Sequence, residues 1–132
     1  MVRVECFVLD RDGVRVAEED VDTIVLIQVG REIRLPSRYE GVEVRNARAI
    51  RQVKPEDFPV VARNIVRVIE DVPSDRRLAV VPSGALAINV LWAVFVGFNH
   101  RVFLVGQWNP ERGDYDWFKV SPSIRDFFLG RD

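Results

Sequence analysis

The chain has 132 residues, 48% of them hydrophobic and 30% charged, with a formal net charge of -1. This length is typical of one domain that buries a core without disulfides or metal ions. The near-zero net charge excludes a global field that attracts bulk nucleic acid or an anionic membrane, so an anionic ligand has to be met by a local site.

Three features indicate a cytoplasmic protein without a membrane partner. Cys6 is the lone cysteine, so no disulfide can form within one chain, which suits a reducing compartment. The first residues, MVRVECFVLD, read as a strand and lack the layout of a signal peptide. The longest apolar run, residues 85–98, is shorter than the roughly 20 residues that cross a bilayer.

The first part of the chain predicts strands. Residues 2–9 alternate with a period of two, and Asp10-Arg11-Asp12-Gly13 supplies a turn into residues 14–16, which indicates a hairpin. Residues 23–29 are nearly all apolar and rich in β-branched side chains, as in a central strand. Residues 32–35 are typical of a return strand.

An arginine series follows a short edge strand expected at Val42 and Val44. Arg45, Arg48 and Arg51 recur every three residues, so a helical turn would place them on one side. Two interpretations stay open: a solvated arginine face, or a patch that faces phosphate.

The rest of the chain alternates helices and strands. The apolar spacing predicts the following elements: a helix from Pro55 to Val72, a strand at 78–81, an apolar helix at 85–98, strands at 101–105 and 115–120 around a turn at 109–114, and a helix at 121–129. A strand–helix–strand crossover implies parallel pairing with a right-handed connection. We therefore predict an α/β fold in a single compact domain, residues 1–132, with a mixed β-sheet, a β-α-β-α-β-β core and helices packed on the sheet.

Two segments are candidates for ligand binding or chemistry. Pro82-Ser83-Gly84 joins the carboxyl end of a buried strand to a helix start, where ligands bind in α/β sheets and where backbone N–H groups and the Ser83 hydroxyl suit a phosphate. The alternative is a helix start capped by Ser83. His100, the only histidine, follows the apolar helix and is either a helix-ending residue or a proton-transfer group.

A third group combines aromatic rings, amides and an arginine around the turn at 109–114. Such side chains suit purine bases and phosphates. An exposed hairpin or an oligomer interface would use the same residue types. The group consists of Gln107, Trp108, Asn109, Arg112, Tyr115 and Trp117.

Taken as one unit, residues 83–113 resemble the small CRISPR-associated ring nucleases, which bind and linearise cyclic tetra-adenylate with manganese. Ser83-Gly84 matches the family's strand end, His100 its helix-ending histidine, and Trp108-Asn109-Pro110-Glu111-Arg112-Gly113 its aromatic residue and Asp-Pro-x-x-Gly turn. The opening FVLDRDG and Lys54-Pro55-Glu56 match more loosely. The CRISPR-associated Rossmann-fold sensors of cyclic oligoadenylates share the same order of elements.

The resemblance implies a role in CRISPR-linked antiviral signalling, with a cyclic oligoadenylate as the ligand. The ring is symmetric, which suits a site shared by two identical chains, so a homodimer or higher oligomer is expected. The implied catalytic residues are His100 as general acid or base, with Ser83 and Arg112 as stabilisers of developing charge. The implied ligand-binding residues are Pro82, Ser83, Gly84, Asn89, Gln107, Trp108, Asn109, Arg112 and Tyr115.

One position departs from the family pattern. Asn109 stands where the family has its metal-binding aspartate, and a neutral amide oxygen is a poorer ligand for a divalent cation than a carboxylate. Manganese is therefore an open expectation. Two alternatives to a ring nuclease stay open: a non-catalytic sensor or sequestering or interaction subunit, and an unrelated α/β domain with a coincidental match.

Overall fold

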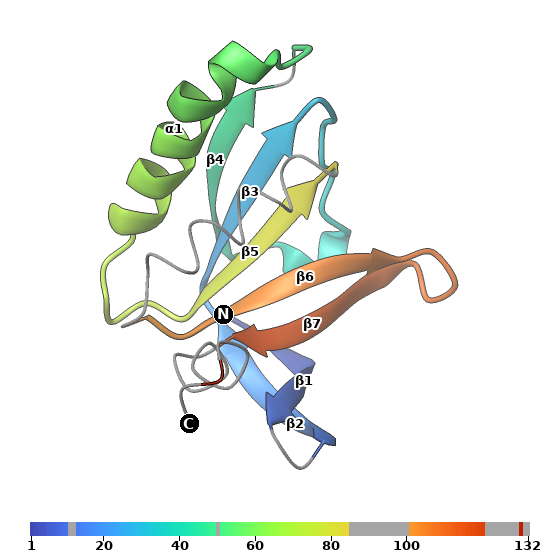
Figure 1. Ribbon diagram of the computed structural model, residues 1–132. Coiled ribbons are helices and arrows are strands. Elements are labelled where there is room, and N and C mark those ends of the chain that lie inside the picture. Colours follow the sequence, from blue (N-terminus) through green and yellow to red (C-terminus); the bar gives the residue numbers. More distant parts are fainter. Residues whose placement is uncertain (11–12, 50, 85–100, 121–129, 131–132) are drawn as a thin grey trace.

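The computed structural model describes residues 1–10, 13–49, 51–84, 101–120 and 130, which contain one mixed sheet of seven strands (Figure 1). The strand order across the sheet is β2-β1-β7-β6-β5-β3-β4. The strands are β1 (Val2–Asp10), β2 (Gly13–Val21), β3 (Thr23–Val29), β4 (Glu43–Ala49), β5 (Leu78–Ser83), β6 (Phe103–Asn109) and β7 (Asp114–Val120).

The sheet has a parallel part and an antiparallel part. β4, β3, β5 and β6 run parallel, β7 is antiparallel to β6, and β1 is parallel to β7 and forms a hairpin with β2. The predicted α/β class, the mixed sheet and the hairpin over residues 2–16 are confirmed. The β-α-β-α-β-β core is not, because the described residues hold one α-helix, α1 (Phe58–Glu70), preceded by the 3₁₀-helix η2 (Pro55–Asp57). The helices predicted at 85–98 and 121–129 lie outside the described residues.

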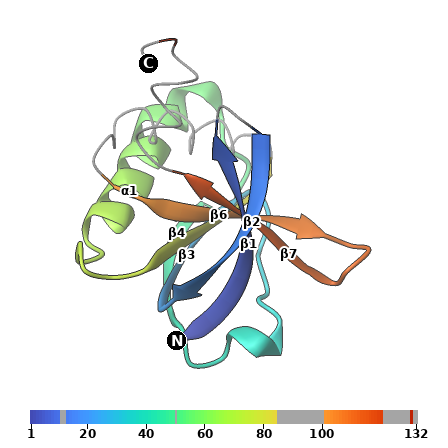
Figure 2. The same cartoon turned by 90° about the horizontal axis from the view of Figure 1, so that it is seen from below.

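The helix α1 covers one face of the parallel part, beside β4 and β3 (Figures 1 and 2). Val61, Ile65 and Ile69 form its buried stripe and pack against Val25 and Ile27 of β3, as the spacing of apolar residues predicts. All seven residues of β3 are buried because β4 and β5 occupy its two edges and both of its faces are covered.

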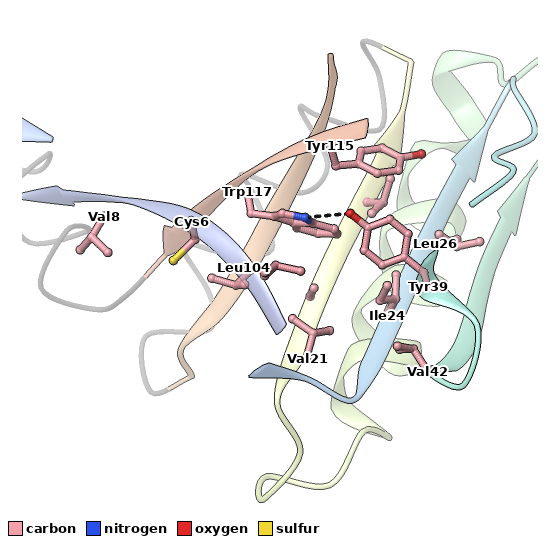
Figure 3. Packing of buried hydrophobic residues seen from close by; sticks show 13 residues of the cluster. Cys6, Val8, Val21, Ile24, Leu26, Tyr39, Val42, Leu104, Tyr115 and Trp117 are labelled. Carbon is pink, nitrogen blue, oxygen red and sulfur yellow. Dashed lines mark hydrogen bonds between the residues drawn. The ribbon is translucent and has the colours of Figure 1, made fainter. Parts of the chain in front are cut away.

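On the opposite face, the β3–β4 connection, residues 30–42, packs against a second core. Tyr39, at the end of the 3₁₀-helix η1 (Ser37–Tyr39), is buried in this second core with Val42 (Figure 3). Ile33 and Leu35 pack against the same core. The return strand predicted at 32–35 is wrong. β3 has no free edge at which a return strand could pair, so these residues cross over the end of the sheet.

The helical turn considered for the arginine series is also wrong. Arg45 and Arg48 lie in β4, whose residues pair with β3 along its whole length, and this ladder outweighs the weak helical tendency of the local sequence. Arg45 bonds to the Glu43 carboxylate at 2.6 Å and to the Asp71 carbonyl at 2.9 Å.

The β6–β7 hairpin projects beyond the sheet on the side away from α1 in both views (Figures 1 and 2). The predicted turn at 109–114 is confirmed, with a bond of 3.2 Å from the Arg112 N–H to the Asn109 carbonyl. No helix within the described ranges has the length and hydropathy that crossing a membrane requires.

Candidate functional site

The order in which the chain visits neighbouring parallel strands reverses between β3 and β5. The chain passes from β3 to β4 on one side and then, through α1, to β5 on the other. At such a switch point the connections leave the carboxyl ends of neighbouring strands in opposite directions, and ligands bind in the crevice between them. The segment Pro82-Ser83-Gly84 lies at this point. Pro82 and Ser83 are the last residues of β5, two residues beyond the predicted strand, and the helix start expected after them lies outside the described residues.

β5 and β6 also separate at this edge of the sheet. They pair only at Ala79–Leu104 and Val80–Val105. Pro82, which has no N–H to donate, lies beyond the last of these pairs, where a proline costs β5 no bond to β6. Because β7 runs antiparallel to β6, its first residues return to the same edge.

A cavity of about 270 Å³ lies at the switch point. One wall is the start of the β3–β4 connection, a second is the end of β5, and the third comes from the β6–β7 hairpin. The lining residues are Arg31, Glu32, Ile33, Arg34, Val81, Pro82, Ser83, Gly84, Trp108 and Tyr115.

Two buried polar side chains hold the first wall in place. Gln28, at the end of β3, accepts a bond from the Ile33 N–H at 2.8 Å and donates to the Asn46 side chain at 2.7 Å. Ser83 donates its hydroxyl to the Arg31 carbonyl at 2.8 Å, with the Ile27 carbonyl at 3.3 Å. The backbone of residues 31–33 is therefore fixed from β3 and from β5.

Gly84 is required by the backbone at this edge. Its φ is +81°, and a Cβ added to it would lie 3.0 Å from the Val29 carbonyl oxygen. Any other residue would be strained and would crowd the end of β3. The chain therefore leaves β5 in a conformation that keeps the cavity wall free of a side chain.

The cavity combines cationic and aromatic groups. Arg31 and Arg34 are exposed and have no carboxylate partner among the described residues, while Glu32 contributes one negative charge. Trp108 is 47% exposed and packs edge-on against Tyr115, with ring centroids 5.1 Å apart. Guanidinium groups beside an exposed indole suit a ligand with phosphates and a planar base.

A buried hydrogen-bond network lies next to the cavity wall that the β6–β7 hairpin forms. Asp114 accepts bonds from Arg38 and from the Tyr39 hydroxyl, the latter at 2.6 Å. The Trp117 indole N–H donates to the same hydroxyl at 3.2 Å (Figure 3). Burial, reinforced by the bond to Asp114, raises the pKa of Tyr39 to about 12. The network joins the β3–β4 connection to β7 and so fixes the position of Tyr115.

The structure brings together part of the predicted site. Pro82, Ser83, Gly84, Trp108 and Tyr115 line one cavity, although they come from β5 and from the hairpin. Gln107, Asn109 and Arg112 do not line it. Asn89 and His100 lie outside the described residues. Trp117 is buried beneath the site and contacts Tyr39 and Tyr115.

The turn residues are engaged with one another. Arg112 pairs with Asp116 at 2.6 Å, and the Asn109 amide donates to the same carboxylate at 3.0 Å. The Asn109 oxygen accepts the Glu111 N–H at 3.1 Å. These residues do not fit a manganese site, since the amide oxygen is used and an arginine neutralises the nearest carboxylate. Across the described ranges, no three histidine, cysteine or acidic side chains are grouped to hold a metal ion.

Sequence reasoning missed Arg31, Arg34 and Gln28. Gln28 left a signal, because it is the one polar side chain of the run IVLIQV and a buried amide needs partners. Arg31 and Arg34 left none, because a loop of this composition is usually a solvated surface.

Comparisons of the chain with protein-family models, with curated proteins and with solved structures gave no match. The site is therefore interpreted from its own geometry and from the motif resemblance of residues 83–113.

Proposed function

We propose that this protein binds a cyclic oligoadenylate, cyclic tetra-adenylate first among them, in CRISPR-linked antiviral signalling. The observation that carries the proposal is the cavity at the switch point, where Arg31 and Arg34 meet Ser83-Gly84 and the exposed Trp108. The motif resemblance supplies the ligand class, and the cavity supplies groups that suit it.

Each part of the ligand has a counterpart. Arg31 and Arg34 bind phosphate oxygens, since a guanidinium presents two parallel donors to them. Gly84 lines the same cavity, so its backbone N–H is a candidate donor to a phosphate oxygen. Trp108 stacks on an adenine, an interaction worth about 1–3 kcal/mol per base.

The size of the cavity favours a shared site. About 270 Å³ is at or below the lower end of the usual range for small-molecule pockets, whereas a ring of four nucleotides is large. Two copies related by a two-fold axis would each hold half of the ring. Dimerisation is accordingly part of the proposal.

Binding without metal-dependent cleavage is the form of the function that the side chains favour. The Ser83 hydroxyl donates its single proton to a backbone carbonyl, and Arg112 and Asn109 are bonded to Asp116. The single proton of Ser83 is therefore already used, and the Asp116 carboxylate offsets the positive charge of Arg112. We therefore place a sensor or sequestering role ahead of ring opening, for which His100 is the remaining candidate acid or base.

The test measures affinity and product together. Purified protein is titrated with cyclic tetra-adenylate by calorimetry, with and without manganese, and the mixtures are then separated by chromatography. We expect binding that is independent of manganese, about one ring per two chains, and an intact ring. Linear product that disappears in His100→Ala would make the protein a ring nuclease.

Matched variants locate the site. Arg31→Gln/Arg34→Gln should lower the affinity at least about 100-fold, because each bond to a charged phosphate is worth about 1.5–3 kcal/mol. The control Arg76→Gln/Arg77→Gln removes the same charge at the amino ends of the strands. Equal affinity of both double variants, or no binding by the unmodified protein, would contradict the proposal.

A further inference from the structure

A second basic cavity lies on the α1 side of the sheet. This groove, of about 720 Å³, runs between the end of β4 and α1. It is lined by Arg48, Ala49, Arg51, Val60, Val61, Arg63, Asn64 and Arg67. Of these eight described residues, four are arginines and none is acidic.

These arginines differ from others in the described part of the chain. Arg38, Arg45 and Arg112 each pair with a carboxylate at close range. Within the described ranges, by contrast, Arg48, Arg63 and Arg67 have no ion pair, and Arg51 reaches only 3.9 Å from Asp57.

Grouping these arginines destabilises the fold by charge repulsion, so we expect the group to have a function. Arg63 and Arg67 are four residues apart on α1, and like charges at this spacing destabilise a helix. The arginines of β4 and of the segment after it, Arg48 and Arg51, add further positive charge to the same groove. A face that served only solubility would interleave acids with these side chains, as β1 and β2 do where Arg3 pairs with Glu18.

The positive charge of the groove exceeds what one phosphate neutralises. Arg63 and Arg67 are separated by about 6 Å along the helix axis, and Arg48 and Arg51 approach from a different part of the fold. Four guanidinium groups carry about +4, whereas a single phosphate group carries about −2 at neutral pH. The ligand that matches this charge is an anion with several phosphates.

Exposed apolar side chains at this end of α1 favour one class of ligand. Val60, in the groove, is 70% exposed, and Phe58, at the start of α1 and outside the groove lining, is 36% exposed. Single-stranded nucleic acids bind where basic side chains follow the backbone and aromatic rings stack on the bases, and Phe58 supplies an exposed ring two residues before Val60. The net charge of -1 gives no general attraction for them, so such binding depends on the groove.

We propose that the groove between β4 and α1 binds the phosphates of linear single-stranded nucleic acid, as a site separate from the cavity at the switch point. Among the described residues, the two sites share no lining residue. The inference does not depend on the proposed function, because neither the ligand nor the arginines are the same.

The test uses a fluorescently labelled single-stranded RNA of about 10 nucleotides, within the site sizes common for small single-strand-binding domains. Anisotropy is measured at several salt concentrations for the unmodified protein, for Arg63→Gln/Arg67→Gln and for the control Arg76→Gln/Arg77→Gln. Glutamine keeps the helix propensity of arginine, and circular dichroism verifies the fold of each variant.

The groove variant should bind at least about 10-fold more weakly, and its slope of log affinity against log salt should fall by about 1.4, since each lost phosphate contact removes about 0.7. The control and Arg31→Gln/Arg34→Gln should bind RNA as the unmodified protein does. Unlabelled RNA should displace the probe, and cyclic tetra-adenylate should not.

Three results would overturn the inference. The first is no RNA binding by the unmodified protein at low salt. The second is an equal loss of affinity in the groove variant and in the control. The third is displacement of the probe by phosphatidylserine vesicles or by polyglutamate as effectively as by RNA, which would assign the groove to anionic surfaces in general.

Discussion

Replacing Tyr39 by phenylalanine tests the buried network beneath the site. The change removes one hydroxyl, which donates to Asp114 at 2.6 Å and accepts from the Trp117 indole at 3.2 Å. A bond to a charged group contributes about 1.5–3 kcal/mol and a neutral one about 0.5–1.5 kcal/mol. Asp114 keeps its bonds to Arg38 and to the Tyr115 N–H, so its charge stays partly compensated.

We expect Tyr39→Phe to lower the free energy of unfolding by about 2–4 kcal/mol, out of the roughly 5–15 kcal/mol typical of a domain. Urea denaturation followed by tryptophan fluorescence measures this value. With a slope of about 2 kcal/mol per molar urea, in the middle of the typical range, the midpoint should fall by about 1–2 M at an unchanged slope.

Tyr115→Phe is the matched control. Tyr115 is also buried, but its hydroxyl makes no hydrogen bond among the described residues. The same chemical change should therefore cost less than about 0.5 kcal/mol, within the range of substitutions that break no specific interaction. If the two variants had equal free energies of unfolding, the hydroxyl of Tyr39 would not contribute and the reasoning would be refuted.

Three further predictions concern pH, packing and the cavity wall. The pKa of Tyr39 rises from 10.0 to about 12 on folding, so its hydroxyl contributes stability below pH ~10 that is lost as the pH rises through ~12. Between these pH values, the free energy of unfolding of Tyr39→Phe should fall by about 2–3 kcal/mol less than that of the unmodified protein, as measured by urea denaturation at each pH. Gly106→Ala would place a Cβ 2.6 Å from the buried Trp117 ring and should lower the unfolding free energy by about 1–3 kcal/mol in the same assay, whereas an unchanged value would mean that the ring can move. Ser83→Ala removes the bond to the Arg31 carbonyl, so trypsin should cut after Arg31 faster than in the unmodified protein; an equal rate would show that Ser83 does not hold the loop.

Local pattern was sufficient for most of the elements. The alternation in residues 2–9, the apolar run of β3, the helical stripe of Val61, Ile65 and Ile69, and the turn after Asn109 all predicted what the structure contains. These signals are reliable because the spacing of apolar residues along a helix or strand shows which of its faces is buried. The same reasoning placed Pro82-Ser83-Gly84 at a strand end, where a ligand site is expected.

Which element packs against or pairs with each strand or helix was decided only by the tertiary structure. Residues 32–35 carry the composition of a strand, yet both edges of β3 are taken by β4 and β5, so the segment becomes a cavity wall held by Gln28 and Ser83. Arg45 finds its carboxylate partner, Glu43, two residues away in the same strand, whereas Arg48 shares a groove with Arg63 and Arg67 that only the packing of α1 beside β4 creates.

The sequence by itself therefore determined the α/β class, most of the described strands and the helix α1, and the cavity residues contributed by β5 and by the β6–β7 hairpin. Only the tertiary structure decided that Arg31 and Arg34 join Ser83 and Trp108, and that Arg48 joins Arg63 and Arg67. The physical reason is that hydrophobic periodicity records whether a side is buried, whereas the grouping of charged side chains depends on strand order, which long-range pairing sets.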